Sequence, residues 1–232
     1  AAGVDTNMNG PRDEGVTGKC LVMVTPDAER TMNTYLGITS ELHQKHIDEN
    51  ALAQSEYVYI EGYLVTSELS REAAIRVREL ARQNNVKVAM TFSDPAMVQF
   101  FKEGITDMIG TGVDLLFCNE QEAKLFTNTD DIDAAIEGLK KVAKTFAITL
   151  GSKGAVAFDG EQLHTIAPHS VTAVDSNGAG DMFAGAFLYA ITHGHDFAAA
   201  GRLASAASAQ VVSQFGPRLN AEQHEPLKQH LA

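Results

Sequence analysis

The chain has 232 residues, 44% of them apolar, which is enough for one large α/β domain or one domain with a small appendage. Its formal net charge of −12 argues against non-specific nucleic-acid binding, which needs clustered lysine and arginine. No apolar run approaches the ~18 residues of a membrane span, and the first residues lack the basic and apolar regions of a signal peptide. We therefore expect no nucleic-acid partner, no membrane contact and a cytoplasmic location.

The first part of the chain predicts a hairpin. Residues 1–15 are polar and contain glycine and proline, so we expect a loop. Lys19–Thr25 and Arg30–Leu36 have the composition of strands, and Pro26-Asp27 between them is typical of a turn. Because no crossover helix follows immediately, this hairpin is expected to stand off the main sheet. Residues 40–53 predict a polar helix.

From Glu56 onward, strand patterns alternate with helix patterns. The predicted strands are Tyr57–Ile60, Val86–Phe92, Val113–Phe117, Phe146–Leu150, Ala155–Phe158 and Gln162–Ile166. The last two flank Asp159-Gly160, which predicts a second hairpin. The predicted helices are Ser70–Gln83, one from Pro95, one after Asn119–Glu122, Asp131–Lys144, one ending at His193, and one over Asp196–Ser213, followed by a Gly216-Pro217 break and a polar tail. This alternation predicts an α/β fold, with a mostly parallel sheet covered by helices on both faces.

The polar turns of this pattern all follow strands. They are Asp94, Asn119–Glu122, Gly151–Gly154 and Asp175–Asp181. Because ligands of such sheets bind beyond the carboxyl ends of the strands, these turns predict one common site. The two cysteines, Cys20 and Cys118, lie in strand-like apolar runs and are expected to be buried thiols in a reducing compartment.

The stretch Asp175–Asp181 is the most informative of these turns. It is small and glycine-rich, and it opens a helix, so its free N–H groups and the positive end of the helix dipole can bind an anion. Gly178 and Gly180 would let the backbone approach a ligand closely. Asp181 would repel that anion unless it takes a proton from the group that attacks it. The alternative is an ordinary helix start, where aspartate is a favoured residue.

Two further motifs suit a nucleotide. Asn119 and Glu122 are three residues apart at a helix start and suit Mg²⁺ held largely through water. The alternative is that Asn119 caps the helix and Glu122 is an ordinary acidic residue of its first turn. Thr149–Gly154 could lie along phosphates or a base, or form a simple tight turn with Lys153 in solvent. It is not a Walker A loop. The histidine pairs, His43 with His46 and His193 with His195, are interpreted as surface residues because no cysteine or carboxylate completes a zinc set.

Together these motifs resemble the ribokinase-like (PfkB) carbohydrate and nucleoside kinases. Asp175–Asp181 followed by Phe183 matches the family's Asp-Thr-x-Gly-Ala-Gly-Asp signature, with Ser176 in place of threonine. Asn119 and Glu122 match Asn-x-x-Glu, and Thr149–Gly154 matches Thr-Leu-Gly-x-x-Gly. Thr17-Gly18 and residues 26–31 resemble the lid of the adenosine-kinase branch. The resemblance covers nearly the whole chain, with all three motifs in the family's order and spacing.

The resemblance implies a ribokinase-like fold with a Rossmann-like sheet. Residues 16–37 would form the β lid, and residues 1–15 and 38–232 the nucleotide-binding and catalytic domain. Asp181 would be the catalytic base, and the turn at Gly178, Ala179 and Gly180 would hold the developing charge. The other implied contacts are Asn119, Thr149, Gly151, Gly154, Ala207 and Ser208 for ATP, Glu122 for Mg²⁺, Asp175 for K⁺, and Arg30 and Asp94 for the lid and the phosphates.

The implied activity is phosphorylation of a hydroxymethyl group of a small molecule, with adenosine first. The alternatives are a sugar kinase of the ribokinase, fructokinase or 2-keto-3-deoxygluconate kinase type, another nucleoside kinase, and a non-catalytic nucleotide-binding domain. The opening part of the family pattern, including its Gly-Gly-x-x-x-Asn signature, is absent, so we expect the chain to be a fragment or a partner to supply that part. A homodimer through the lid is also compatible with the resemblance.

Overall fold

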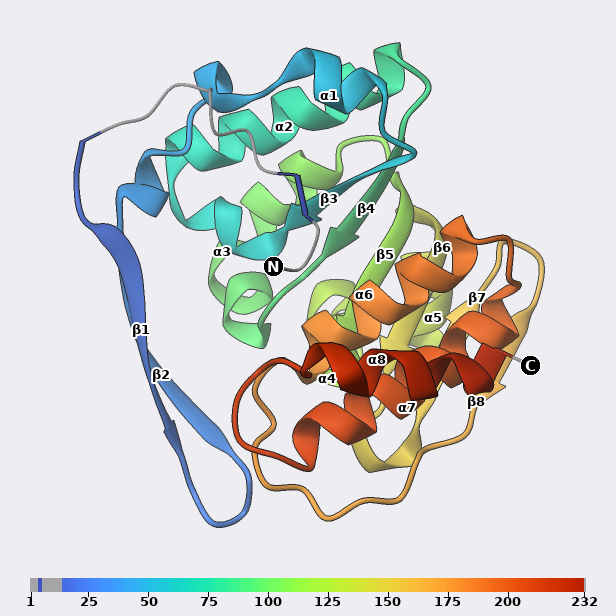
Figure 1. Ribbon diagram of the computed structural model, residues 1–232. Coiled ribbons are helices and arrows are strands. Elements are labelled where there is room, and N and C mark those ends of the chain that lie inside the picture. The colour runs from blue at the N-terminus through green and yellow to red at the C-terminus, as the bar shows by residue number, and fades with distance from the viewer. Residues whose placement is uncertain (1–3, 6–13, 232) are drawn as a thin grey trace. The chain divides into compact units, whose positions relative to one another are not determined.

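The computed structural model describes residues 4–5 and 14–231 (Figure 1). The chain divides into two compact units. Unit 1 contains Ala1–Cys20, Thr34–Phe117 and Gln121–Lys144, and unit 2 contains Leu21–Asn33, Cys118–Glu120 and Thr145–Ala232. The predicted division into a lid and one large domain stays a prediction.

The elements form a two-stranded sheet and a six-stranded sheet. The strands are β1 (Thr17–Val24), β2 (Arg30–Gly37), β3 (Tyr57–Glu61), β4 (Lys87–Thr91), β5 (Val113–Asn119), β6 (Ala143–Thr149), β7 (Ala155–Phe158) and β8 (Leu163–Ile166). The α-helices are α1 (Glu49–Ala53), α2 (Glu68–Gln83), α3 (Pro95–Ile109), α4 (Glu120–Thr127), α5 (Ile132–Leu139), α6 (Ala179–Thr192), α7 (Phe197–Val212) and α8 (Ala221–Leu227). The strand orders are β1-β2 and β3-β4-β5-β6-β7-β8, which confirms the separate hairpin and the α/β architecture.

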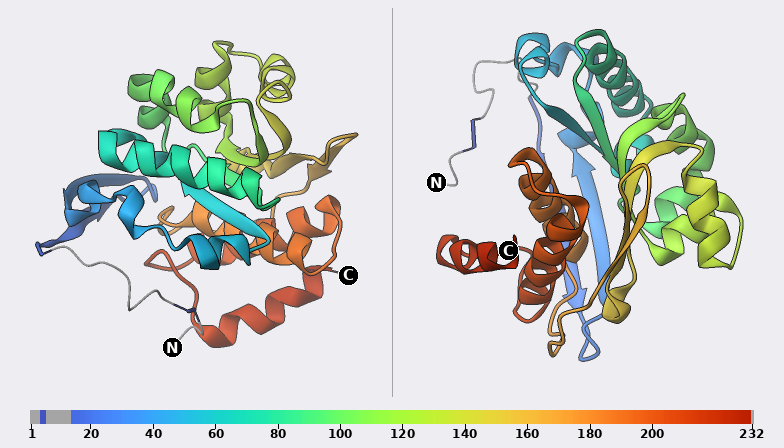
Figure 2. Two further views of the ribbon diagram at one scale, coloured as in Figure 1. Left: turned by 90° about the horizontal axis from the view of Figure 1, so that it is seen from above. Right: turned by 90° about the vertical axis from the view of Figure 1, so that its right-hand side faces the viewer.

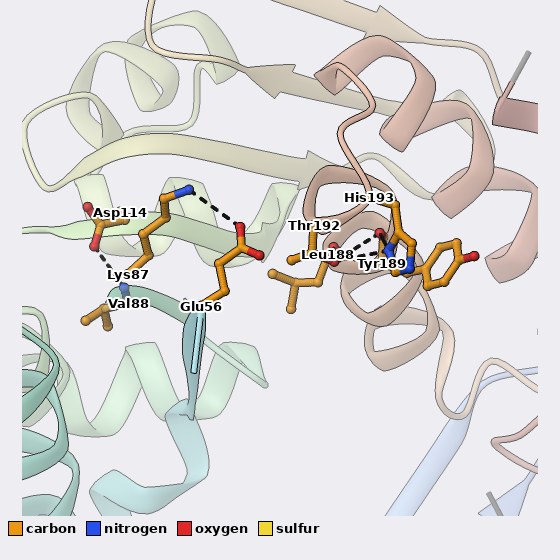
Figure 3. Close-up of polar contacts among 8 residues, drawn as sticks. All are labelled: Glu56, Lys87, Val88, Asp114, Leu188, Tyr189, Thr192 and His193. Atoms are coloured by element: carbon orange, nitrogen blue, oxygen red, sulfur yellow. Dashed lines mark hydrogen bonds and ion pairs between the residues drawn. The ribbon is translucent and has the colours of Figure 1, made fainter. Parts of the chain in front are cut away.

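Unit 1 contains the parallel part of the sheet. Strands β3, β4 and β5 pair in parallel, with Ile60 opposite Met90 and Met90 opposite Leu116. These three residues are buried, as expected of parallel strands covered on both faces. At the start of β4, the carboxylate of Asp114 accepts the N–H of Val88 at 2.8 Å, and this contact fixes where the pairing of β4 and β5 begins (Figure 3).

Unit 2 contains an antiparallel meander and two packed helices. Strands β6, β7 and β8 pair antiparallel, and the predicted Asp159-Gly160 hairpin is confirmed. The Asp159 carboxylate accepts the N–H groups of Gln162 and Glu161 at 2.8 Å and contacts His164 at 2.7 Å. The N–H of Gln162, and after it the His164 ring, hold the pKa of Asp159 well below its usual range.

Helices α6 and α7 of unit 2 pack against each other, and α7 also contacts β7 and β8 (Figure 2). The buried face of α7 is made mostly of alanine, and the other buried residues are Gly201, Leu203, Ser205 and Val211. A Cβ at Gly201 would lie 2.4 Å from the side chain of Ile166. The small residues of α7 therefore let its backbone approach β8 closely. At the end of α6, the carbonyl oxygen of Tyr189 lies 2.7 Å from Nδ1 of His193 (Figure 3).

Several predicted boundaries were wrong in unit 1. Residues 40–53 form two 3-10 turns, Ile38–Glu41 and Gln44–His46, followed by the short helix α1, because His43 and Asp48 each accept backbone N–H bonds that start a new turn. Helix α2 begins at Glu68 instead of Ser70. The helix predicted over Asp131–Lys144 ends at Leu139, since the chain turns there and the carbonyl of Val142 accepts the N–H of Val113.

The polar tail contains a helix that was not predicted, because Asn220 and Gln223 form a reciprocal capping box that starts α8. One other prediction was wrong. Cys118 is buried as predicted, whereas Cys20 is exposed on the hairpin, where only one strand neighbours β1 among the described residues.

The start of α6 depends on a glycine with a left-handed backbone. Gly178 has φ of +78°, and a Cβ there would lie 2.5 Å from the carbonyl oxygen of Pro217. Gly185, in the middle of the same helix, is exposed, and a Cβ there would meet no atom within 4 Å. The same substitution should therefore have opposite effects at these two positions.

We predict that Gly178→Ala lowers the free energy of unfolding by more than about 1 kcal/mol, the usual cost of left-handed backbone in alanine. Gly185→Ala should raise it by ~0.5–1 kcal/mol because alanine favours helix. Thermal unfolding monitored by circular dichroism checks both predictions. The melting temperature should shift by about 2–4 °C for each kcal/mol of stability gained or lost. Equal melting temperatures for Gly178→Ala and the parent protein would contradict the predicted role of this turn.

Candidate functional site

The N-terminus of α6 provides unoccupied backbone donors. The N–H of Ala179 donates to the carbonyl of Ser176 at 3.4 Å, and the N–H of Met182 makes the first bond of the helix, to Gly178 at 2.9 Å. Within the described ranges, the N–H groups of Gly180 and Asp181 have no acceptor. The Asp181 side chain is exposed in the first turn. The turn thus combines donors for an anion with a carboxylate that solvent and ligands can reach.

Asp175 fixes the conformation of this turn. Its side chain is buried, and its two carboxylate oxygens accept the N–H groups of Asn177 and Gly216, each at 2.9 Å. The N–H groups of Val174 and Asp175 both donate to the carbonyl of Val212 at the end of α7. The turn is therefore tied to α7 and to the segment after it. The K⁺ contact implied for Asp175 stays a prediction.

A cavity of about 480 Å³ lies beside the turn, within unit 2. This volume is within the usual range of ~300–1,000 Å³ for small-molecule sites. Among the lining residues are Ser176, Ala179 and Gly180 of the turn and start of α6. The remaining lining residues are Asp27, Ala28, Glu29, Thr149, Gly151, Ser152, Gly154, Pro168, His169, Ser170, Val171, Ala173, Phe183, Ser205, Ser208, Ala209 and Val212. The cavity thus brings together two of the three predicted motifs.

The turn after β6 forms one wall of this cavity. Gly151 and Gly154 have φ of +59° and +94°, and the N–H of Leu150 donates to the carbonyl of Gly154 at 2.8 Å. A Cβ at Gly154 would collide with the backbone of Ile166, whereas a Cβ at Gly151 would meet no atom within 4 Å. Gly154 is therefore required by the fold, and Gly151 leaves room for a ligand. Lys153 extends into solvent, as interpreted from the sequence, and pairs with Glu120 at 3.4 Å.

Helix α7 forms a second wall made of small side chains. The hydroxyl of Ser208 donates to the carbonyl of Ala179 at 2.9 Å, and that of Ser205 to the carbonyl of Ala167 at 3.0 Å. Ser208 lines the cavity, as its predicted role requires. Ala207 is buried, and its neighbours Ser208 and Ala209 line the cavity in its place, so a nucleotide contact of Ala207 stays a prediction.

The tip of the hairpin closes a third side. Arg30 donates from Nη1 to Oγ of Ser176 at 3.1 Å, and the N–H of Ser176 donates to the carbonyl of Ala28 at 3.2 Å. Asp27 and Glu29 of the same tip line the cavity. The hydroxyl of Thr25, and after it the N–H of Glu29, lower the pKa of Asp27, so this carboxylate carries its charge at neutral pH.

Eight predicted site residues do not line the cavity. They are Arg30, Asp94, Asn119, Glu122, Asp175, Gly178, Asp181 and Ala207. Asn119 ends β5 and belongs to unit 2. Glu122 is buried in α4, and Asp94 caps α3 by accepting the N–H of Ala96 at 2.7 Å; both belong to unit 1. Their contacts with Mg²⁺ or phosphates stay predictions.

The sequence analysis missed the segment from Pro168 to Ala173, which lines the cavity after β8. A signal was available, because this segment leaves the end of one strand and leads directly into the glycine turn. Burial, and after it the charge of His230, lower the pKa of His169 in this segment. The two rings lie 4.9 Å apart, edge to face.

In the part of the chain that the structure describes, no three His, Cys, Asp or Glu side chains are placed to hold a metal ion. Nor does any helix among these residues combine the length and apolar character needed to cross a membrane.

Comparison with known proteins agrees with the motifs. The family model "pfkB family carbohydrate kinase" matches residues 1–224. Adenosine kinase from Saccharomyces cerevisiae is 27% identical over 236 residues, covering 95% of this chain and 68% of that protein. The structure of a probable sugar kinase from Rhizobium etli CFN 42 matches with a TM-score of 0.87 and 34% identity, over 91% of this chain and 65% of that one. Adenosine kinase from Sinorhizobium meliloti matches with a TM-score of 0.88 and 32% identity, over 92% of this chain and 66% of that one.

The chain thus spans about two thirds of the length of these three proteins. The two structural matches confirm the predicted ribokinase-like α/β fold. The match of the family model over almost the whole chain, together with the order of the three motifs, leads to one conclusion: the chain belongs to the pfkB family of carbohydrate kinases.

Proposed function

We propose that this chain is the nucleotide-binding and catalytic part of an ATP-dependent kinase that phosphorylates a hydroxymethyl group of a small molecule, with adenosine as the preferred acceptor. One observation carries the proposal. The free N–H groups of Gly180 and Asp181 and the exposed carboxylate of Asp181 belong to one helix turn, and Gly180 lines the cavity. Phosphoryl transfer needs these two elements together, an anion site and a group that takes the proton of the attacking hydroxyl.

The cavity fits a nucleotide. A Cβ at Gly151 or at Gly180 would extend into open space, so both glycines leave room at the cavity wall for phosphates to approach the backbone. The small residues Ser205, Ser208 and Ala209 on α7 leave space for a planar base. These features support a placement in which the phosphates lie along the turn and the glycines after β6, and the base lies against α7.

In the proposed reaction, the Asp181 carboxylate accepts the proton of the acceptor hydroxyl, and the freed oxygen attacks the terminal phosphate of ATP in line. The bond from that phosphorus to the oxygen bridging the β- and γ-phosphates breaks, and ADP leaves with its electron pair. The N–H groups of Gly180 and Asp181 stabilise the charge that develops on the transferred group, because they are aligned before the reaction begins. Asp175 maintains this alignment through its two backbone contacts. Arg30 contributes a positive charge from the hairpin tip, next to Ser176.

Mg²⁺, which neutralises phosphate charge when bound, would be held near Asn119 and Glu122. Few protein ligands are needed, since Mg²⁺ in such sites is coordinated mainly by phosphates and water. K⁺ would brace the turn at Asp175. A homodimer through the hairpin stays a prediction.

Two observations bear on the acceptor. The relatives include adenosine kinases and a probable sugar kinase at similar identity. The hairpin carries Val22, Val24 and Tyr35, and an apolar flap suits a planar base better than a sugar covered with hydroxyl groups. Adenosine is therefore preferred, with a free sugar as the second candidate. A non-catalytic nucleotide-binding domain is disfavoured because such a protein would be free to lose Asp181.

We predict that Asp181→Asn lowers kcat by ~10²–10⁴ because the base is lost, while ATP still binds. The matched control is Asp131→Asn, which removes another helix-start aspartate, one that accepts the N–H of Ala134 at 2.8 Å. The control should lose stability only. Steady-state kinetics and nucleotide titration of the protein as its gene encodes it test this prediction. If Asp181→Asn keeps a parental kcat, Asp181 contributes only a negative charge to the first turn of α6.

Activity should require Mg²⁺ and should rise with K⁺. Excess chelator should abolish turnover, and restoring Mg²⁺ should recover it, because the phosphate charges otherwise stay unneutralised. Replacing K⁺ with a large organic cation at constant ionic strength should slow the reaction. Full turnover in excess chelator would contradict the Mg²⁺ proposal. An unchanged rate after K⁺ is replaced would contradict the K⁺ proposal.

The identity of the acceptor is tested by measuring ADP release with adenosine, inosine, guanosine, ribose, fructose and 2-keto-3-deoxygluconate. We expect the highest kcat/KM with adenosine. A free sugar with a kcat/KM well above every nucleoside would contradict the adenosine assignment while leaving the kinase proposal intact. ADP release without any acceptor serves as the background for hydrolysis.

A further inference from the structure

Ser176 is the point at which the hairpin tip contacts the catalytic turn. Its hydroxyl accepts a hydrogen bond from Nη1 of Arg30 at 3.1 Å. Its N–H donates to the carbonyl oxygen of Ala28 at 3.2 Å. Its own carbonyl oxygen accepts the N–H of Ala179, the first residue of α6. One residue therefore connects two residues of the hairpin with the start of the catalytic helix.

The tip that contacts Ser176 is internally ordered. The N–H of Thr25 donates to the carbonyl of Glu29, and that of Ala28 to the carbonyl of Thr25, both at 2.9 Å. The Asp27 carboxylate accepts the hydroxyl of Thr25 at 2.5 Å and the N–H of Glu29 at 3.2 Å. Ala28 is 4% exposed. The tip is thus ordered by hydrogen bonds among four residues, and it docks as a preformed unit.

Docking at Ser176 determines one wall of the cavity. Asp27, Ala28 and Glu29 line the cavity together with Ser176 itself. If the tip left Ser176, that side of the cavity would lose three of its lining residues. The contact therefore controls how enclosed the cavity is, without placing Ser176 in the chemical step.

We propose that Ser176 is a positioning residue that holds the hairpin tip on the catalytic turn, so that the nucleotide binds to a cavity already closed on the hairpin side. This inference rests on the proposed kinase function. It assigns to the hydroxyl of Ser176 a role in nucleotide affinity, separate from the role of Asp181 in turnover.

The variant Ser176→Ala isolates this contact. It removes the acceptor for Arg30 and leaves the guanidinium in place, whereas Arg30→Gln also removes a charge from the site. Ser176→Thr is the matched control because it keeps the hydroxyl. For the loss of one charge-assisted hydrogen bond, we expect the KM for ATP to rise by about three- to tenfold, with kcat within about twofold of the parent. Ser176→Thr should keep the parental KM.

Hydrogen exchange measured by mass spectrometry tests the contact without any substrate. Backbone N–H groups of residues 21–33 should exchange about three- to tenfold faster in Ser176→Ala and in Arg30→Gln, and the double variant should be no faster than Arg30→Gln alone. Exchange in α7 should stay unchanged in every variant, which shows that the fold is intact. Parental exchange of residues 21–33 in Ser176→Ala, or fully additive effects in the double variant, would overturn the inference.

The two proposals can fail separately. A parental protein that phosphorylates no acceptor would remove the kinase function, and the exchange data would still decide whether Ser176 holds the tip. An active enzyme whose Ser176→Ala variant has an unchanged KM for ATP would remove the positioning role and leave the kinase function standing.

Discussion

The site depends on one buried carboxylate. Asp175 accepts two backbone N–H groups, one from the turn that opens α6 and one from Gly216 beyond α7. Hydrogen bonds to an ionised carboxylate are shorter and stronger than those between neutral groups. If the carboxylate were lost, two N–H donors would lack their acceptor, at about 1–3 kcal/mol each where they are buried. Both the left-handed Gly178 against Pro217 and the open donors of Gly180 and Asp181 follow from this link.

A second constraint is the small size of the residues around the cavity. Helix α7 contains alanine, serine and glycine where an ordinary core helix would carry leucine or isoleucine. At Gly201 the small residue permits close packing against Ile166, and at Ser205, Ser208 and Ala209 it leaves space. The same composition thus produces tight packing toward β8 and an open cavity near the turn. The volume of the cavity follows in part from the small side chains of this one helix.

The sequence predicted those features that are encoded locally. The start of α6, the Asp159-Gly160 hairpin and the turn after β6 rest on glycines and aspartates whose backbone preferences act within a few residues. Residues 40–53 were mispredicted, and helix α8 of the C-terminal tail was not predicted, because capping by His43, Asp48 and Asn220 competes with the apolar pattern. The contact of Arg30 with Ser176 was not predictable, since it joins segments far apart in the chain. The wall formed by Pro168 to Ala173 was overlooked, although this segment leads from a strand directly into the glycine turn.

The backbone of Ala28 bears on how the hairpin meets a ligand. Ala28 has φ of +65°, a conformation that glycine adopts freely and that costs alanine roughly 1–2 kcal/mol. Alanine at a positive φ destabilises the conformation that requires it by more than it gains from restricting the unfolded chain. The docked tip is therefore strained at one residue, and the hydrogen bonds of Ser176 with Ala28 and Arg30 offset that strain. Once those bonds break, the strain favours release of the tip, so the residue that helps to close the cavity also favours its opening.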